Sequence, residues 1–172
     1  MDIRKAIAEE HSKAQCNRIV HYIGADKKRF EKLMQAFFEG DRRSMQRASW
    51  PLSCCVKEHP SLIVPYLGRL IGLLEDQTVH DAVKRNTTRL LAEVDIPKKY
   101  HGKVMNACFH FISDVKTAVA IKAFSLTLLD NLSRSYPEIT RELNLVISER
   151  WPAETAAFRS RAKKILQRQS SR

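Results

Sequence analysis

Glycine, cysteine and long apolar runs are scarce in this sequence of 172 residues, and each shortage excludes a class of protein. The five glycines build no Gly-rich phosphate cradle, and no GxGxxG, P-loop, GxSxG or HExxH motif is present. No apolar run approaches the roughly 20 residues that a bilayer crossing needs. The first residues, Met1 to Lys5, are charged and lack the apolar stretch of a signal peptide. We therefore expect a cytoplasmic protein with no membrane segment, no cofactor and no recognisable catalytic residue.

The four cysteines form no metal-ligand pattern. They are Cys16, Cys54, Cys55 and Cys108, and none of them makes a CxxC motif. Cys54 and Cys55 are adjacent, so on a helix they would point about 100° apart. This suits neither a disulfide framework nor a zinc knuckle. We predict small buried thiols in a reducing compartment, and no metal ligand.

A 38-residue repeat is the strongest pattern that is present. When the sequence is shifted by 38, Leu90 coincides with Leu52, Leu128 and Leu166. Other coincidences are Val83 with Met45 and Ile121, Val94 with Val56 and Leu132, Met105 with Leu67 and Leu143, Cys108 with Leu70 and Val146, Phe109 with Ile71 and Ile147, and Asp76 with Asp114. Periods of this size are typical of stacked helical units.

Each repeat reads as two amphipathic helices. Val83, Leu90 and Val94 are spaced i, i+7 and i+11, which places them on one stripe of a helix. Met105, Cys108, Phe109 and Ile112 make a similar stripe on the second helix. One pair cannot bury both stripes alone, so the sequence predicts stacked pairs that share a continuous core.

The repeat resembles the HEAT family over roughly residues 41 to 168. The resemblance rests on a hydrophobic and basic pair followed by small and leucine-type positions. These positions are Val83-Lys84 with Thr87 and Leu91, and Ile121-Lys122 with Ser125 and Leu129. The family often places an aspartate six residues before the basic residue, whereas here Asp76 and Asp114 come eight residues before it. The resemblance implies an all-α, right-handed α-α superhelix of the HEAT-like, armadillo-type solenoid class.

We expect a single domain of about nine helices. Residues 1–40 are predicted to form two capping helices, over 2–23 and 26–39, that match the repeat poorly. Three repeats follow, at 41–75, 76–113 and 114–150, and residues 151–172 are predicted to form a closing helix and a basic tail.

A polar strip on the second helices is the candidate binding site. In HEAT-type stacks these helices line the concave face. The strip consists of Lys103, Asn106 and His110, the equivalent Arg141, Asn144 and Ser148, and Arg69 in the preceding repeat. Residues spaced i, i+3 and i+7 share one face of a helix. We predict that this strip binds a partner; the alternative is an ordinary solvated face.

The net charge of +11 is concentrated near the C-terminus. Residues 151–172 contain one acidic side chain and six basic ones, which include Arg159, Arg161, Lys163, Lys164 and Arg168. A basic surface favours polyanions, but it also suits the soluble end cap that a repeat array needs. Some DNA glycosylases that remove alkylated bases are similar in being basic and built from HEAT-like repeats.

The most favoured function is a non-catalytic scaffold that holds a protein partner. Nucleic-acid binding through the basic residues is the alternative, and an enzyme whose site is assembled across repeats is third.

Overall fold

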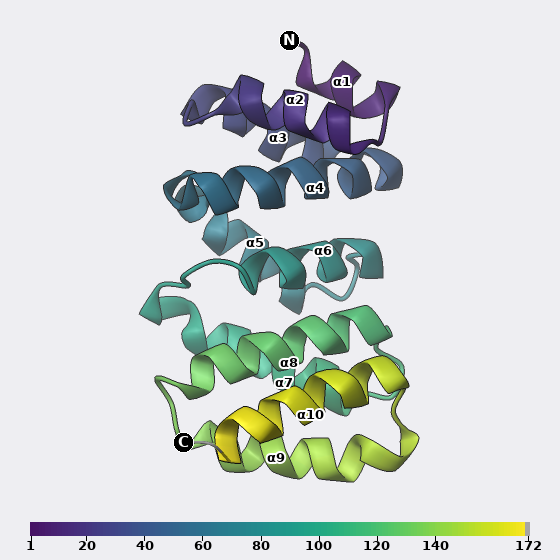
Figure 1. The fold of residues 1–172 in the computed structure, drawn as a ribbon, viewed down its shortest axis with the longest axis vertical. Helices are drawn as coiled ribbons and strands as arrows, with labels where there is room; N and C mark the ends of the chain where they lie inside the picture. The colour runs from purple at the N-terminus through teal and green to yellow at the C-terminus, as the bar shows by residue number, and fades with distance from the viewer. Residues whose placement is uncertain (171–172) are drawn as a thin grey trace. The chain divides into compact units, whose positions relative to one another are not determined.

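The computed structural model describes residues 1–170, and every regular element in that range is a helix (Figure 1). The α-helices are α1 (Ile3–Glu9), α2 (Lys13–Ile23), α3 (Lys27–Glu39), α4 (Arg42–Glu58), α5 (Leu67–Glu75), α6 (Asp81–Leu91), α7 (His101–Ser113), α8 (Val119–Ser133), α9 (Ile139–Arg150) and α10 (Ala156–Ser170). Three 3-10 helices are η1 (Pro60–Tyr66), η2 (Lys98–Tyr100) and η3 (Trp151–Ala153). The all-α prediction is confirmed, with ten described α-helices where about nine were expected. Ser171 and Arg172, at the end of the predicted basic tail, lie outside the described residues.

The helices form two compact units. The N-terminal unit is Met1–Leu70 with Glu93–Asp95, and the C-terminal unit is Ile71–Ala92 with the chain from Ile96 onward. Within the N-terminal unit, α4 contacts α1, α2, α3 and η1. Within the C-terminal unit, α8 contacts α6, α7, α9 and α10. Each unit is therefore organised around the first helix of one repeat.

One repeated apolar position of the sequence, that of Leu90, is a core position in three repeats. Leu52, Leu90 and Leu128 are 1%, 2% and 1% exposed, while their counterpart Leu166 is half-buried on the last helix. Burying a leucine side chain stabilises a fold by about 1.5–3 kcal/mol. The Leu90 position is thus buried in the same way in the first helices of three repeats, α4, α6 and α8.

The predicted apolar stripes are wrong in part. The helix α6 ends at Leu91, so Val94 lies beyond it and is half-buried. On α7, Met105 and Phe109 are half-buried, whereas Val104 and Phe111 are buried.

The helix expected over residues 2–23 is wrong, because it is broken into α1 and α2. Glu10 is extended, and the Ser12 side chain accepts a hydrogen bond from the Gln15 backbone N–H, which starts α2. The end of α1 is capped by side chains from elsewhere. Gln15 Nε2 donates to the Ala6 carbonyl at 2.7 Å, and an Arg47 guanidinium nitrogen donates to the Ala8 carbonyl at 2.7 Å. The broken helix accounts for the tenth helix in the count.

Residues 1–40 nevertheless follow the 38-residue spacing. Moved forward by 38, the span of α1 and α2 falls on α4, and the span of α3 falls on α5. Asp26 is the N-cap of α3 and accepts hydrogen bonds from the Lys28 and Arg29 backbone N–H groups. The match is hidden in the sequence because the break between α1 and α2 interrupts the helical pattern.

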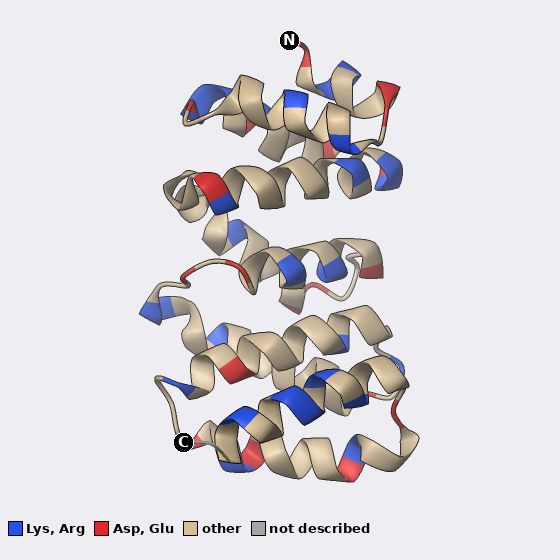
Figure 2. Ribbon diagram, in the orientation of Figure 1, with Lys and Arg blue, Asp and Glu red and all other residues tan. Residues whose placement is uncertain are grey.

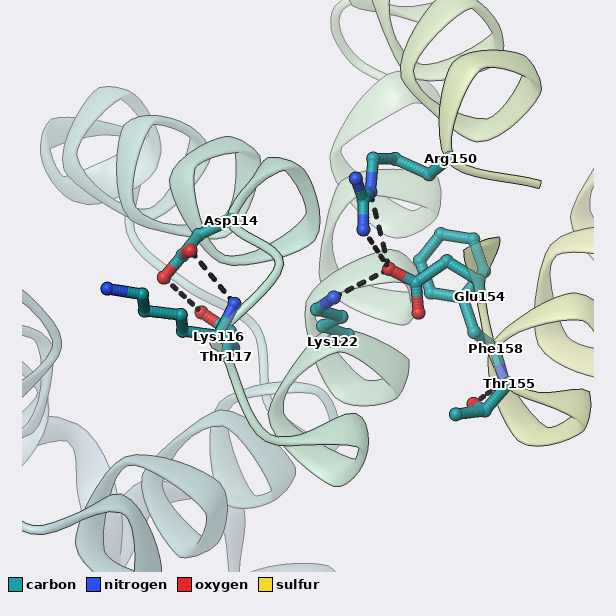
Figure 3. Close-up of polar contacts among 8 residues, drawn as sticks. All are labelled: Asp114, Lys116, Thr117, Lys122, Arg150, Glu154, Thr155 and Phe158. Atoms are coloured by element: carbon teal, nitrogen blue, oxygen red, sulfur yellow. Dashed lines mark hydrogen bonds and ion pairs between the residues drawn. The ribbon is translucent and has the colours of Figure 1, made fainter. Parts of the chain in front are cut away.

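A buried ion pair links α8 to the segment that precedes α10 (Figure 3). Lys122 Nζ lies 2.6 Å from Glu154 Oε1, and both side chains are 3% exposed. Arg150 lies 3.0 Å from the same carboxylate oxygen. Asp114, which the family pattern would set against the basic residue, instead closes its own turn with the Lys116 backbone N–H and the Thr117 hydroxyl. The counter-charge of Lys122 therefore comes from a residue much later in the chain, and not from the aspartate that precedes it.

The closing helix α10 packs on α8 through one apolar side. Phe158, Ala162 and Ile165 are fully buried there. At the other end of the helix, Arg168 forms an ion pair with Asp130 of α8 at 2.7 Å. The opposite side of α10 remains open to solvent, and it carries most of the basic residues of this helix.

Candidate partner-binding surface

The predicted polar strip lies on α7 and α9, which contact each other within the C-terminal unit. On α7, the side chains of Lys103, Asn106 and His110 are all exposed. The inward side of the same helix carries Val104 and Cys108, each 0% exposed. The amphipathic division of α7 therefore leaves the predicted triplet facing solvent.

The equivalent residues of α9 are arranged in almost the same way. Arg141 and Ser148 are exposed, while Leu143 and Ile147 point into the core and are 0% exposed. Asn144 differs, because it is half-buried and its Oδ1 atom is buried without a hydrogen-bond partner among the described residues. Two helices thus present the triplet, and in the second the central amide is recessed.

The charged side chains of the strip form only weak ion pairs with other residues of the protein. Lys103 Nζ lies 3.6 Å from Glu75 Oε2, and the two side chains are 62% and 48% exposed. Exposed pairs of this kind contribute about 0–1 kcal/mol, so Lys103 can change partners at little cost. At the end of α7, the pKa of Asp114 lies below its ordinary value. The largest cause is the hydrogen bond from the Lys116 backbone N–H, and the nearby charge of His110 makes a smaller contribution.

Arg69 belongs to the N-terminal unit and is described there by itself. Its guanidinium lies 3.9 Å from the centre of the Phe38 ring, and the side chain is exposed. A cation placed over an aromatic face is attracted by the ring quadrupole, which restrains the side chain. Arg69 is therefore a positioned surface cation.

Leu145 is a surface residue that the sequence prediction missed. It is 57% exposed on α9, one turn after Arg141 and three residues before Ser148. The sequence did contain a signal for this exposure. Leu145 lies two residues from Leu143 and from Ile147, and therefore on the other side of the helix from these inward residues. An exposed leucine between polar residues supplies apolar area that the strip otherwise lacks.

Basic residues recur along α10 (Figure 2). The side chains of the predicted polyanion surface on this helix are exposed. Within residues 1–170, no carboxylate forms an ion pair with Arg159, Arg161, Lys163 or Lys164. Arg168 differs, because it pairs with Asp130, a side chain that is 3% exposed. Removing Arg168 would leave a buried carboxylate unpaired, so this arginine has a packing role and the other four do not.

The described residues contain no group of three or more His, Cys, Asp or Glu side chains arranged to hold a metal ion. None of the helices within residues 1–170 combines the length and apolar character that a membrane crossing requires.

Comparison with known families agrees with the packing of the helices. A family model described as HEAT repeat domain matches residues 3–169. The chain belongs to the HEAT repeat domain family. The match begins at residue 3, and so extends beyond the resemblance over 41 to 168 that the sequence suggested. HEAT repeats are helical solenoids that commonly act as protein-interaction scaffolds. No curated protein and no solved structure matches the chain.

Proposed function

We propose that this HEAT repeat protein is a non-catalytic scaffold that holds a protein partner on the strip formed by α7 and α9. One observation carries the proposal. The two contacting helices expose the same polar triplet at equivalent repeat positions, with five of the six side chains exposed and Asn144 half-buried. A repeated register of this kind makes a continuous surface that an extended or helical segment can follow.

The chemistry of the strip defines the partner that suits it. Lys103 and Arg141 favour carboxylates, and arginine can bind a carboxylate through two parallel hydrogen bonds. Asn106 offers donor and acceptor groups to a peptide backbone, whereas Asn144, whose Oδ1 is buried, offers only its amide N–H donors. Leu145 adds an apolar contact beside them. A partner segment with acidic side chains around an apolar residue matches these groups.

The test is affinity capture with matched surface variants. The Arg141→Ala/Asn106→Ala double variant removes one charge and one amide from the strip. The Arg42→Ala/Asn17→Ala variant removes the same groups from exposed positions of the N-terminal unit. Proteins that bind the parent and the control but not the strip variant support the proposal. Recovery of the same proteins by all three contradicts it.

Stability measurements separate lost binding from lost folding. Arg141 is exposed, so Arg141→Ala should change the free energy of unfolding by no more than about 0.5 kcal/mol. Capture should also weaken only modestly with salt if apolar and amide contacts contribute.

Nucleic-acid binding is the second candidate, and the four unpaired cations of α10 favour it. Phosphate contacts release counterions, so the slope of log Kobs against log salt is about −0.9 per phosphate neutralised on duplex DNA. Changing Arg159, Arg161, Lys163 and Lys164 to glutamine should then reduce both affinity and salt slope.

The matched control changes Lys5, Lys13, Lys28 and Lys57 to glutamine, which are exposed in the N-terminal unit. It lowers the net charge equally and keeps α10 intact. Equal retention of both variants on DNA or heparin would mean that α10 is no specific surface. Arg168 is left unchanged because of its ion pair with Asp130.

A further inference from the structure

Two cysteine side chains meet inside the N-terminal unit. The Sγ atoms of Cys16 on α2 and Cys54 on α4 lie 3.9 Å apart. Cys16 is 4% exposed, whereas Cys54 is half-buried and reachable from solvent. The sequence predicts only small buried thiols, so their proximity is a finding of the tertiary structure.

The two cysteines are separated by 38 residues, so they occupy the same position in two consecutive 38-residue units. The C-terminal unit shows the same geometry. Asp130 and Arg168 have the same spacing in the sequence, and their side chains pair at 2.7 Å. Contact at this position is therefore produced by the stacking of the repeats. The C-terminal unit fills the position with an ion pair, and the N-terminal unit fills it with two thiols.

We propose that Cys16 and Cys54 form a redox pair that closes to an intramolecular disulfide when the protein meets a peroxide. A disulfide bond is about 2.05 Å long, so the two sulfurs must approach each other by about 2 Å. Cys16 also lines a water-sized cavity of about 10 Å³ with Ser12, Arg47 and Trp50. The thiol is therefore not packed tightly on every side.

The reaction balances with hydrogen peroxide as the oxidant. The Cys54 thiolate attacks the peroxide and becomes a sulfenic acid, with hydroxide as the leaving group. The Cys16 sulfur then attacks the Cys54 sulfur, and the sulfenic oxygen leaves as water with the proton of the Cys16 thiol. In total, two thiols and one peroxide give one disulfide and two waters, with two electrons passing from sulfur to oxygen.

The short distance between the sulfurs and the accessibility of Cys54 select this pair over the other cysteines. Burial, with the neighbouring Cys54, raises the pKa of Cys16 to about 12, so Cys16 is a thiol at neutral pH. Burial likewise raises the pKa values of Cys55 and Cys108 to about 12. Both are 0% exposed. Cys54 is therefore the entry point for the oxidant, because it is the most accessible of the four.

Closure would tie α2 to α4 across 38 residues. A loop of this length, closed without strain, restricts the unfolded chain and raises Tm on the order of 10 °C. The break between α1 and α2 lies next to the bridge. The disulfide would thus stiffen the region in which the first helix of the array is interrupted.

Mass spectrometry of the oxidised full-length protein tests the linkage. Trypsin releases Cys16 in Ala14–Arg18, and it releases Cys54 together with Cys55 in Ala48–Lys57. The wild-type protein is treated with hydrogen peroxide, its free thiols are blocked, and it is digested without reductant. We expect these two peptides joined, with the loss of two hydrogens, and the same result for Cys55→Ala.

Thermal unfolding supplies the second readout. Oxidised wild-type protein should melt on the order of 10 °C above the reduced protein. Cys54→Ser should lose this difference, and Cys55→Ala should keep it. The proposal is overturned if the bridge joins Cys54 to Cys55 or Cys16 to Cys55, or if it joins two chains. It is also overturned if Cys54 reaches the sulfinic state while Cys16 remains a free thiol.

Discussion

Lys84 on α6 and Lys122 on α8 occupy the same repeat position, and the C-terminal unit treats them differently. Both lysines are buried, at 7% and 3% exposure. Lys122 contacts Glu154 at 2.6 Å, and Arg150 shares that carboxylate. Lys84 Nζ instead lies 5.8 Å from the centre of the Phe111 ring. The pKa of Asp76 is lowered mainly by hydrogen bonds from Thr78. The charge of Lys84 lowers it further by a smaller amount.

Lys84 and Lys122 differ in their ion pairing because the residues that pair around Lys122 have no equivalents one repeat earlier. Moved back by one repeat, Glu154 falls on Lys116 and Arg150 falls on Ile112. The repeat therefore places a lysine inside twice but supplies a full counter-charge once. The repeat position determines that the lysine side chain is buried. The residues of the neighbouring segment determine whether its charge has an ion-pair partner.

Removing the counter-charge of Lys122 should have the largest effect. Glu154→Ala leaves a buried lysine next to Arg150, and loss of one partner from a buried pair costs about 3–5 kcal/mol. Chemical denaturation at neutral pH measures the change. The exposed Glu149→Ala on α9 is the matched control and should change stability by no more than about 0.5 kcal/mol.

The double variant Glu154→Ala/Lys122→Met tests the cause of that loss. It removes both buried charges and keeps apolar volume in place of the lysine, so most of the stability should return. A double variant as unstable as Glu154→Ala would mean that Glu154 acts through something other than Lys122.

Leucine truncation should affect both helices in the same way. Leu90→Ala on α6 and Leu128→Ala on α8 each remove a side chain that is no more than 2% exposed. Each should cost about 2–5 kcal/mol, measured by urea unfolding. A negligible cost at either site would show that the apolar position is not equivalent in the two repeats, and the comparison of the lysines would lose its basis.

Lys84→Met should have a much smaller effect. Lys84 has no ion-pair partner within residues 1–170, so an apolar side chain of similar length removes a buried charge without leaving another one unpaired. The free energy of unfolding should stay within about 1 kcal/mol of the parent, in either direction. A loss as large as that of Glu154→Ala would reveal a stabilising interaction of Lys84 equal to that of Lys122.

Acid should remove part of the contribution of Glu154. Burial opposes ionisation of this carboxyl, but hydrogen bonds from Lys122 and Arg150 outweigh it, and the pKa lies below the ordinary 4.5. A lowered folded-state pKa means that the stabilisation is present above pH 4.5 and is lost as the pH falls through the folded pKa. The stability difference between the parent and Glu154→Gln should therefore shrink between neutral pH and pH 3. A constant difference would contradict the ion pair.

Comparing Glu154→Gln with the parent is needed because other carboxyls titrate in the same range. Asp26, Asp41, Asp76 and Asp114 also have lowered pKa values, mainly through hydrogen bonds at helix starts and turns. Their contributions are common to both proteins and cancel in the difference.

Much of the fold was predictable because buried leucines recur every 38 residues in the sequence. The stripe through Leu90 and its counterparts specified paired helices, and the Lys84 and Lys122 positions pointed to the HEAT family. The break at Glu10 was missed because it depends on Gln15 and Arg47, and Arg47 is 39 residues from the carbonyl that it caps. The 3.6-residue helical periodicity relates only side chains within one helix.

For the candidate strip, the positions on α7 and α9 came from helical spacing. Spacing alone did not predict that Asn144 is recessed. The exposure of Leu145 was available from its position outside the inward stripe of α9, but this signal was missed. The binding role of the strip stays a prediction until partner capture has tested it.

The sequence by itself determined the helical class and the 38-residue repeat. The helical class follows from the apolar periodicity within each helix, and the repeat follows from matching residues 38 positions apart. Tertiary structure decided which equivalent positions touch and what chemistry results there. Cys16 and Cys54 became neighbours, Asp130 gained Arg168, and Lys122 gained Glu154. The physical reason is range: a helix is specified by hydrogen bonds within one turn, whereas the pairing of buried charges and thiols depends on side chains that are far apart in the sequence.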